Sequence, residues 1–254
     1  MALFTDGPIS DAADLQEYEN AILNVASTEG IDLGSKIRLA QQELAQELLL
    51  FLYRRAPRRD SPLVTRTSRG VKDVVVTDSL RQWHAHKSLA LVYRDAYYNQ
   101  LNDRYQGKWS EYELLAKGSQ QKCFQIGVGL VAEPVPKACP PVLSTVAGVA
   151  AGGMFYVATT WVSGSGQEGA ASDTAQLTTL DGQELVVATT DAPSIAAGWN
   201  VYVGTSPGAL SLQNQSPLAI NSSWTMTGLI SGSPPAKGQQ ATWFVVDQRV
   251  IERG

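Results

Sequence analysis

The sequence predicts an α+β protein of two domains, an N-terminal helical bundle with a long arm and a C-terminal antiparallel β-sandwich. Helical spacing of apolar residues dominates the first half, while the second half holds short β-rich runs separated by turn signals. A cluster of prolines lies where the composition changes. We therefore expect a helical domain at 1–132, an exposed linker at 133–141, a sandwich at 142–241 and an extended tail at 242–254.

The first two expected helices follow from capping residues and apolar spacing. Ser10 or Asp11 can cap a helix that runs to about Ala26, because a side-chain oxygen there accepts the free N–H groups of the first turn. A second helix begins at Ser35. It must end before Pro57, which disfavours helical geometry in the preceding residue.

The longest expected helix begins at Thr77 or Asp78 and continues to about Tyr105. Its apolar residues go most of the way round, so it needs more than one packing neighbour. A short helix is expected at 110–117, and Gly118 is a natural helix stop.

Residues 56–76 are expected to form a long arm between the second and third helices. Pro57 and Pro62 exclude a regular helix, and a group of valines near the end favours extended backbone that pairs there. The basic residues in and beside this arm, against Asp60 alone, are Arg54, Arg55, Arg58, Arg59, Arg66, Arg69 and Lys72. Three interpretations stay open: a solvated loop, docking on an acidic protein surface, and contact with DNA phosphates.

The second half has the pattern of a sandwich. The expected strands are Met154–Ser163, Ala175–Thr179, Glu184–Thr189, Gly198–Gly204 and Ser222–Thr227. Asp181 and Gly182 form a hairpin turn signal. We expect at least one of Trp161 and Trp199 to be a central core residue of the sandwich.

The tail is apolar and β-like, and Trp243, Phe244 and Val246 are its candidate contact residues. Such a segment can add a strand to a neighbour's sheet, with backbone hydrogen bonds supplying affinity. It can equally be the last strand of its own sandwich.

The composition favours a protein that buries surface in an assembly. Charged residues are 17% of the chain, below the roughly 25% of an ordinary soluble domain. The formal net charge of −4 argues against a general polyanion binder. The first residues lack the basic and apolar regions of a signal peptide, and no apolar run has the length of a membrane helix. We expect a soluble compartment and no membrane partner.

No residue pattern indicates catalysis, a cofactor or a metal site. On a helix, the side chains of His84 and His86 point about 200° apart, so the two residues cannot share one metal ion. We expect both histidines to be partly exposed residues of the helix. The Gly-rich stretch 163–169 lacks the Lys-Ser/Thr pair of a phosphate loop and is expected to connect strands. Cys123 and Cys139 are expected to be reduced thiols. We therefore expect a protein that is not an enzyme.

Two parts of the sequence resemble bacteriophage structural proteins. Residues 102–113, Asn-Asp-Arg-Tyr-Gln-Gly-Lys-Trp-Ser-Glu-Tyr-Glu, resemble a pattern near the end of the helical virion adaptor proteins of tailed bacteriophages. The order of helices and arm is also similar. Residues 158–172 and 197–208 are similar to the immunoglobulin- or fibronectin-III-like modules of phage structural proteins.

The resemblance implies a head-to-tail adaptor, or neck protein, that forms a dodecameric ring under the portal. Its partners would be the portal protein and a further neck or tail-completion protein, with packaged DNA passing through the ring without sequence recognition. The protein would be assembled in the host cytoplasm and located in the virion. The alternative is a tail or fibre-attachment protein whose immunoglobulin-like domain binds a partner or a surface glycan.

Overall fold

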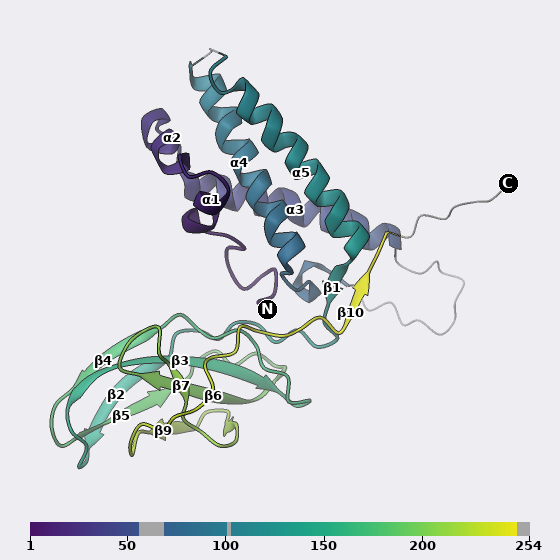
Figure 1. Cartoon of the computed structure of the whole chain (residues 1–254). Coiled ribbons are helices and arrows are strands. Elements are labelled where there is room, and N and C mark those ends of the chain that lie inside the picture. The colour runs from purple at the N-terminus through teal and green to yellow at the C-terminus, as the bar shows by residue number, and fades with distance from the viewer. Residues whose placement is uncertain (56–68, 101–102, 248–254) are drawn as a thin grey trace, which may run out of the picture. The chain divides into compact units, whose positions relative to one another are not determined.

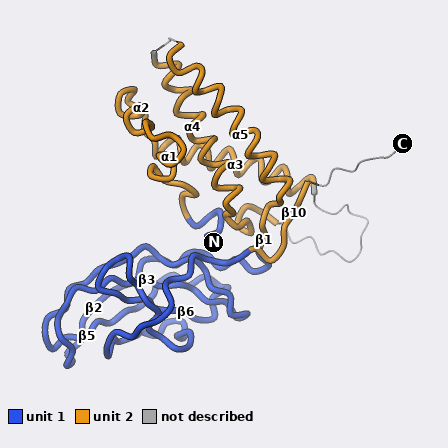
Figure 2. Tube along the Cα trace, in the orientation of Figure 1, with its two compact units in different colours: residues 1–6, 131–240 blue, residues 7–130, 241–254 orange. Residues whose placement is uncertain are grey.

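The computed structural model describes residues 1–55, 69–100 and 103–247, and the chain divides into two compact units (Figure 2). The β unit comprises residues 1–6 and 131–240, and the helical unit comprises residues 7–130 and 241–254. The predicted α+β fold is confirmed. The division differs from the expected one, because the first residues belong to the β unit and the tail belongs to the helical unit. The chain therefore passes between the units three times.

The described part of the helical unit contains five α-helices, a 3₁₀ turn and two short strands (Figure 1). In chain order they are α1 (Ala12–Tyr18), α2 (Ile22–Glu29), α3 (Leu33–Arg55), η1 (Val71–Asp73), α4 (Asp78–Gln100), α5 (Gln106–Ile126), β1 (Val128–Leu130) and β10 (Trp243–Val245). Helices α4 and α5 lie side by side along most of their length (Figure 1). Helices α1, α2 and α3 also pack on α4, so this helix is buried on several sides as its apolar composition requires.

Asp11 caps the first helix, as predicted. Its side chain accepts hydrogen bonds from the N–H groups of Ala13 and Asp14, and the Asp14 carboxylate accepts one from the N–H of Asp11. The expected single helix to Ala26 is wrong, however. The backbone becomes extended at Glu19, and α2 starts a new helix after it.

The expected stop at Gly118 is also wrong, because α5 continues to Ile126 and ends at Gly127, whose φ is 116°. A glycine inside a helix costs about 1 kcal/mol relative to alanine. Beyond Gly118 the helix still buries Ser119 and Cys123, and this packing outweighs the weak local preference.

The core of the helical unit consists of apolar side chains from all five described helices, with the largest share on α4. Its fully buried members include Leu15, Ile22, Leu89, Val92 and Ala96. Helices α1, α2, α3 and α5 each pack against α4, and this arrangement removes apolar surface from water.

The end of the arm pairs with β1, as expected from its valines. Val74 forms an isolated antiparallel bridge with Leu130, and the N–H of Val75 donates to the carbonyl of Gly129 at 2.9 Å. Val74, Val75 and Val76 are all buried. Residues 56–68 of the arm lie outside the described residues.

The β unit contains two antiparallel sheets. Its strands are β2 (Val142–Ala147), β3 (Gly153–Ser163), β4 (Ala175–Thr179), β5 (Gln183–Ala188), β6 (Ala196–Gly204), β7 (Ser211–Leu212), β8 (Leu218–Ala219) and β9 (Ser223–Thr225). One sheet has the order β2-β5-β9 and the other the order β4-β3-β6-β7, with β8 paired to β6. Apolar residues from both sheets share one core, so the unit is a sandwich.

The hairpin expected at Asp181 and Gly182 is wrong. A turn does form there, since Gly182 has a φ of 78° and the N–H of Gln183 donates to the carbonyl of Leu180. The flanking strands do not pair with each other, because β4 belongs to one sheet and β5 to the other. The turn therefore carries the chain between the two layers.

The proline-rich stretch is part of the sandwich rather than an exposed linker. Val135 and Ala138 are buried in the core that includes Trp161 and Trp199. The N–H of Val135 donates to the side-chain oxygen of Gln239 at 2.7 Å. Prolines set an extended backbone here, but the apolar residues between them face the core.

Candidate partner-binding surface

The first turns of α5 fasten α1 and α2 to the helical bundle. Lys108 Nζ lies 2.9 Å from Glu19 Oε2, and the Tyr112 hydroxyl donates to the same oxygen at 3.0 Å. The Tyr105 hydroxyl donates to Glu29 Oε1 at 2.9 Å. Burial alone would raise the pKa of Glu19, but the hydrogen bonds from Lys108 and Tyr112 outweigh it and hold the pKa below its usual value. The segment that carries the adaptor resemblance thus has a clear structural role in this chain.

Both histidines are buried, so the expectation of partly exposed residues is wrong. His84 Nε2 donates to the carbonyl of Ile37 at 3.0 Å, which leaves Nδ1 to accept from the Ser10 hydroxyl at 3.0 Å. Burial lowers the pKa of His84 to about 4. His86 Nδ1 lies 2.8 Å from Ser119 Oγ. Residue spacing alone could not predict that both histidines are buried, because α4 packs against neighbours on several sides.

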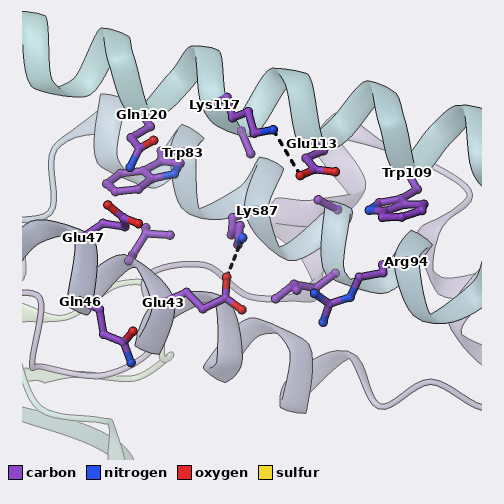
Figure 3. A pocket seen from close by; sticks show the side chains of 14 residues that line it. Glu43, Gln46, Glu47, Trp83, Lys87, Arg94, Trp109, Glu113, Lys117 and Gln120 are labelled. Carbon is purple, nitrogen blue, oxygen red and sulfur yellow. Dashed lines mark ion pairs between the residues drawn. The ribbon is translucent and has the colours of Figure 1, made fainter.

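A groove of about 550 Å³ runs along α4 between α3 and α5 (Figure 3), and we call it the α4 groove. Its floor comes from one face of α4, with Trp83, Lys87, Ala90, Leu91 and Arg94 at successive turns. Trp83 to Arg94 spans eleven residues, or about 16 Å of helix. The groove therefore has the length of three helical turns.

The two walls of the α4 groove carry internal ion pairs. Lys87 Nζ on the floor lies 2.6 Å from Glu43 Oε2 on α3, and Lys117 Nζ lies 3.4 Å from Glu113 Oε1, both on α5 (Figure 3). These pairs compensate the central charges of the groove.

The two ends of the α4 groove carry opposite charges that are not compensated in this way. Glu47 is exposed near Trp83 at one end and has no ion-pair partner among the described residues, while Arg94 lies near Trp109 at the other end (Figure 3). Arg94 Nε approaches Asp95 only to 4.0 Å, and that carboxylate is also paired with Lys36. The groove is therefore acidic at one end and basic at the other.

Large apolar side chains are exposed on the helices that form the walls. On α3 they are Leu49, Leu50 and Tyr53, and Tyr53 is 74% exposed. On α5 they include Leu114, 71% exposed, and Ile126, 63% exposed. Single exposed apolar residues are common, but several of them on adjacent helices indicate a surface available for a partner.

The structure places four of the seven basic residues of the arm. Arg54 is exposed near the end of α3, Arg55 is the last residue of that helix, and Lys72 is exposed on η1. The guanidinium of Arg69 lies over the ring of Trp243, 4.4 Å from its centroid. The other three, Arg58, Arg59 and Arg66, lie outside the described residues.

The described part of the tail, residues 242–247, does not form the last strand of the sandwich. Trp243 to Val245 pairs antiparallel with Val128 to Leu130, so β10 belongs to the helical unit. The N–H of Thr242 donates to the carbonyl of Leu130 at 2.8 Å. Phe244 is 52% exposed and Val246 is partly buried.

In the β unit, one carboxylate holds the Gly-rich loop against the outer face of a sheet. Glu168 Oε1 accepts hydrogen bonds from the hydroxyls of Thr160 and Tyr202 and from the Asn200 amide. Burial and the hydrogen bond to Glu168 raise the pKa of Tyr202. Residues 163–169 connect β3 towards β4, as predicted, and their charged residue is used to dock the loop.

Among the described residues, the remaining chemistry-bearing groups do not assemble into a metal site. Cys123 and Cys139 are both free, and burial raises the pKa of the Cys123 thiol to about 11. Over residues 1–55, 69–100 and 103–247, no cluster of three or more His, Cys, Asp or Glu side chains can hold a metal ion. None of the helices in these ranges is both long enough and apolar enough to span a membrane.

No protein-family model, curated protein or solved structure matches this chain. The geometry of the described residues is therefore the main guide to what the protein does. Sequence reasoning missed the α4 groove, although its charged residues were visible at helical spacing on three expected helices.

Proposed function

We propose that the protein is a virion structural protein of a tailed bacteriophage, a head-to-tail adaptor that works by contact and carries out no catalysis. The observation that carries this proposal is the surface of the helical unit. An open groove with charged ends lies between α3 and α5, and both helices expose large apolar side chains. Surfaces of this kind are used in association more often than in chemistry.

The adaptor resemblance of residues 102–113 supports the phage assignment. In this chain the described part of that segment starts α5 and anchors α1 and α2 through Glu19 and Glu29. The proposed partners are the portal protein on one side and a further neck or tail-completion protein on the other. Twelve copies would form a ring that passes packaged DNA, as the resemblance implies.

Co-expression with the portal protein of the same phage tests the proposal. We expect a complex of defined stoichiometry whose mass, measured by native mass spectrometry, corresponds to a ring on the portal. A chain that stays unassembled, and does not bind the portal at low or high salt, would overturn the adaptor assignment. A trimer that binds a glycan would instead favour the fibre-attachment alternative.

The basic arm gives the portal assay a second readout. Arg58→Glu combined with Arg59→Glu should slow portal binding, with the largest effect at low salt, if the arm docks on an acidic surface. The matched control is Arg38→Glu with Arg81→Glu, which makes the same change in charge on α3 and α4 outside the arm. If the two double variants bind the portal equally well at every salt concentration, the arm is a solvated loop.

A further inference from the structure

The charges of the α4 groove indicate what kind of partner segment it fits. The central charges are internally paired, as Lys87 is with Glu43. The least compensated charges lie at the two ends, where Glu47 has no ion-pair partner among the described residues and Arg94 approaches Asp95 only to 4.0 Å. An occupant that complements the groove therefore needs one basic group and one acidic group about 16 Å apart.

The shape and lining of the groove favour a helix over a small molecule. Small-molecule sites are mostly apolar with a few polar groups, whereas charged side chains line this groove along its whole length. Between them, Leu44, Ala90, Leu91 and Ala116 form a narrow apolar floor that is itself almost fully buried. An amphipathic helix that lies in a groove presents an apolar strip at helical spacing, with charges on either side of it.

We propose that the α4 groove binds one amphipathic α-helix of a partner protein, with a basic side chain of that helix at Glu47 and an acidic side chain at Arg94. The two side chains are separated by about eleven residues, or three turns. This inference rests on the proposed function, because it specifies the chemistry of the partner that the assembly surface recognises. The charged contacts fix the register, while close packing on the groove floor adds dispersion contacts.

Three synthetic helical peptides with the same apolar face test the proposal. The mixed peptide carries glutamate at one end and lysine at the other, the acidic peptide carries glutamate at both ends, and the basic peptide carries lysine at both. Each is labelled with fluorescein, and its binding to the full chain is measured by fluorescence anisotropy. The natural chain should bind the mixed peptide about threefold to tenfold more tightly than either of the others.

Single charge reversals should change this preference in a defined way. Glu47→Lys makes both ends of the groove basic, so the acidic peptide should become the tightest ligand. Arg94→Glu makes both ends acidic, so the basic peptide should become the tightest. Glu17→Lys and Arg38→Glu are the matched controls, because they make the same charge changes on α1 and α3 outside the groove. Both controls should keep the preference of the natural chain.

Three outcomes would overturn the proposal. The first is no binding of the mixed peptide up to about 1 mM. The second is a set of affinities that follows the net charge of each variant, controls included. The third is a change in the oligomeric state of the peptide-free chain in Glu47→Lys, measured by sedimentation, because the occupant would then be a second copy of this chain. Failure here leaves the portal assay unaffected, whereas normal peptide selectivity without portal binding would reject the adaptor assignment alone.

Discussion

Trp161 on β3 and Trp199 on β6 lie directly opposite each other across two antiparallel strands, and both are buried in the core of the β unit. Trp161 is 2% exposed and Trp199 is 0% exposed. The indole N–H of Trp199 donates to the carbonyl of Ala219 at 3.1 Å, so its polar atom is satisfied inside the sandwich. The prediction that at least one of these tryptophans is a central core residue is confirmed for both.

Replacing either tryptophan with alanine should destabilise the β unit by roughly 3–5 kcal/mol, because the cavity adds to the lost burial of the ring. The measurement is urea unfolding followed by the β-sheet signal in circular dichroism. Val149→Ala is the control, since Val149 is 96% exposed in the same unit. An unfolding midpoint of Trp161→Ala or Trp199→Ala that matches the control would contradict the assigned core.

The burial of His84 should make the helical unit less stable in mild acid. Its folded pKa of about 4 is below the ordinary value of 6.5, so the unfolded chain takes up the proton first. Stability is therefore full above pH 6.5 and falls as the pH is lowered towards 4, by about 3 kcal/mol. Burial also lowers the pKa of His86, so its effect has the same sign.

The comparison of the natural chain with His84→Gln isolates this contribution from that of the carboxylates. Urea unfolding across the same pH range should give a shallower pH dependence for the variant, even though the variant is less stable at neutral pH. Parallel curves for the two proteins would show that folding does not lower the pKa of His84.

Glu19 should be a second source of acid sensitivity, at lower pH. Its folded pKa is below the ordinary 4.5, so its contribution is present above pH 4.5 and is lost as the pH falls through the folded value. At neutral pH, Glu19→Ala should cost roughly 1–3 kcal/mol, because Lys108 and Tyr112 lose their acceptor. Glu17→Ala, an exposed change on α1 two residues earlier, should cost almost nothing. Equal unfolding free energies for the two variants would contradict the stabilising role of the contacts that Glu19 makes with Lys108 and Tyr112.

The helices were predictable where the local pattern and the packing agree. Asp11 caps α1 because a capping box is a local arrangement. Gly118 was misjudged because its helix gains more from packing on α4 than it loses by glycine's weak propensity. The break at Glu19 has no proline or glycine to mark it, and the Glu19 side chain pairs with Lys108 and Tyr112, about ninety residues away in the sequence.

The candidate site shows the same limit of sequence reasoning. Glu47 and Arg94 are on different helices, and only the packing of α3 and α5 on α4 brings them to opposite ends of one groove. The tail is a similar case, since a short apolar run predicts a strand without identifying its partner. Pairing between β1 and β10 joins residues more than a hundred positions apart.

The tail should therefore stabilise the helical unit, and Trp243 is the residue that tests this role. Trp243→Ala removes the ring that lies under the guanidinium of Arg69 and weakens the pairing of β10 with β1. We expect faster hydrogen exchange at the Thr242 amide, which donates to Leu130, and an unfolding free energy of the helical unit that is lower by roughly 1–3 kcal/mol. Phe244→Ala is the control on the same strand.

Phe244 is 52% exposed, so Phe244→Ala should leave hydrogen exchange at the Thr242 amide nearly unchanged. This variant is therefore the better one for probing contacts of the tail with a partner. Deletion of residues 242–254 cannot serve that purpose, because it removes the whole of β10 along with any contact surface. A portal-binding defect in Phe244→Ala at normal stability would assign the exposed face of the tail to a partner. Unchanged exchange at Thr242 in Trp243→Ala would instead mean that β10 is held by its backbone pairing with β1 and not by the stack on Arg69.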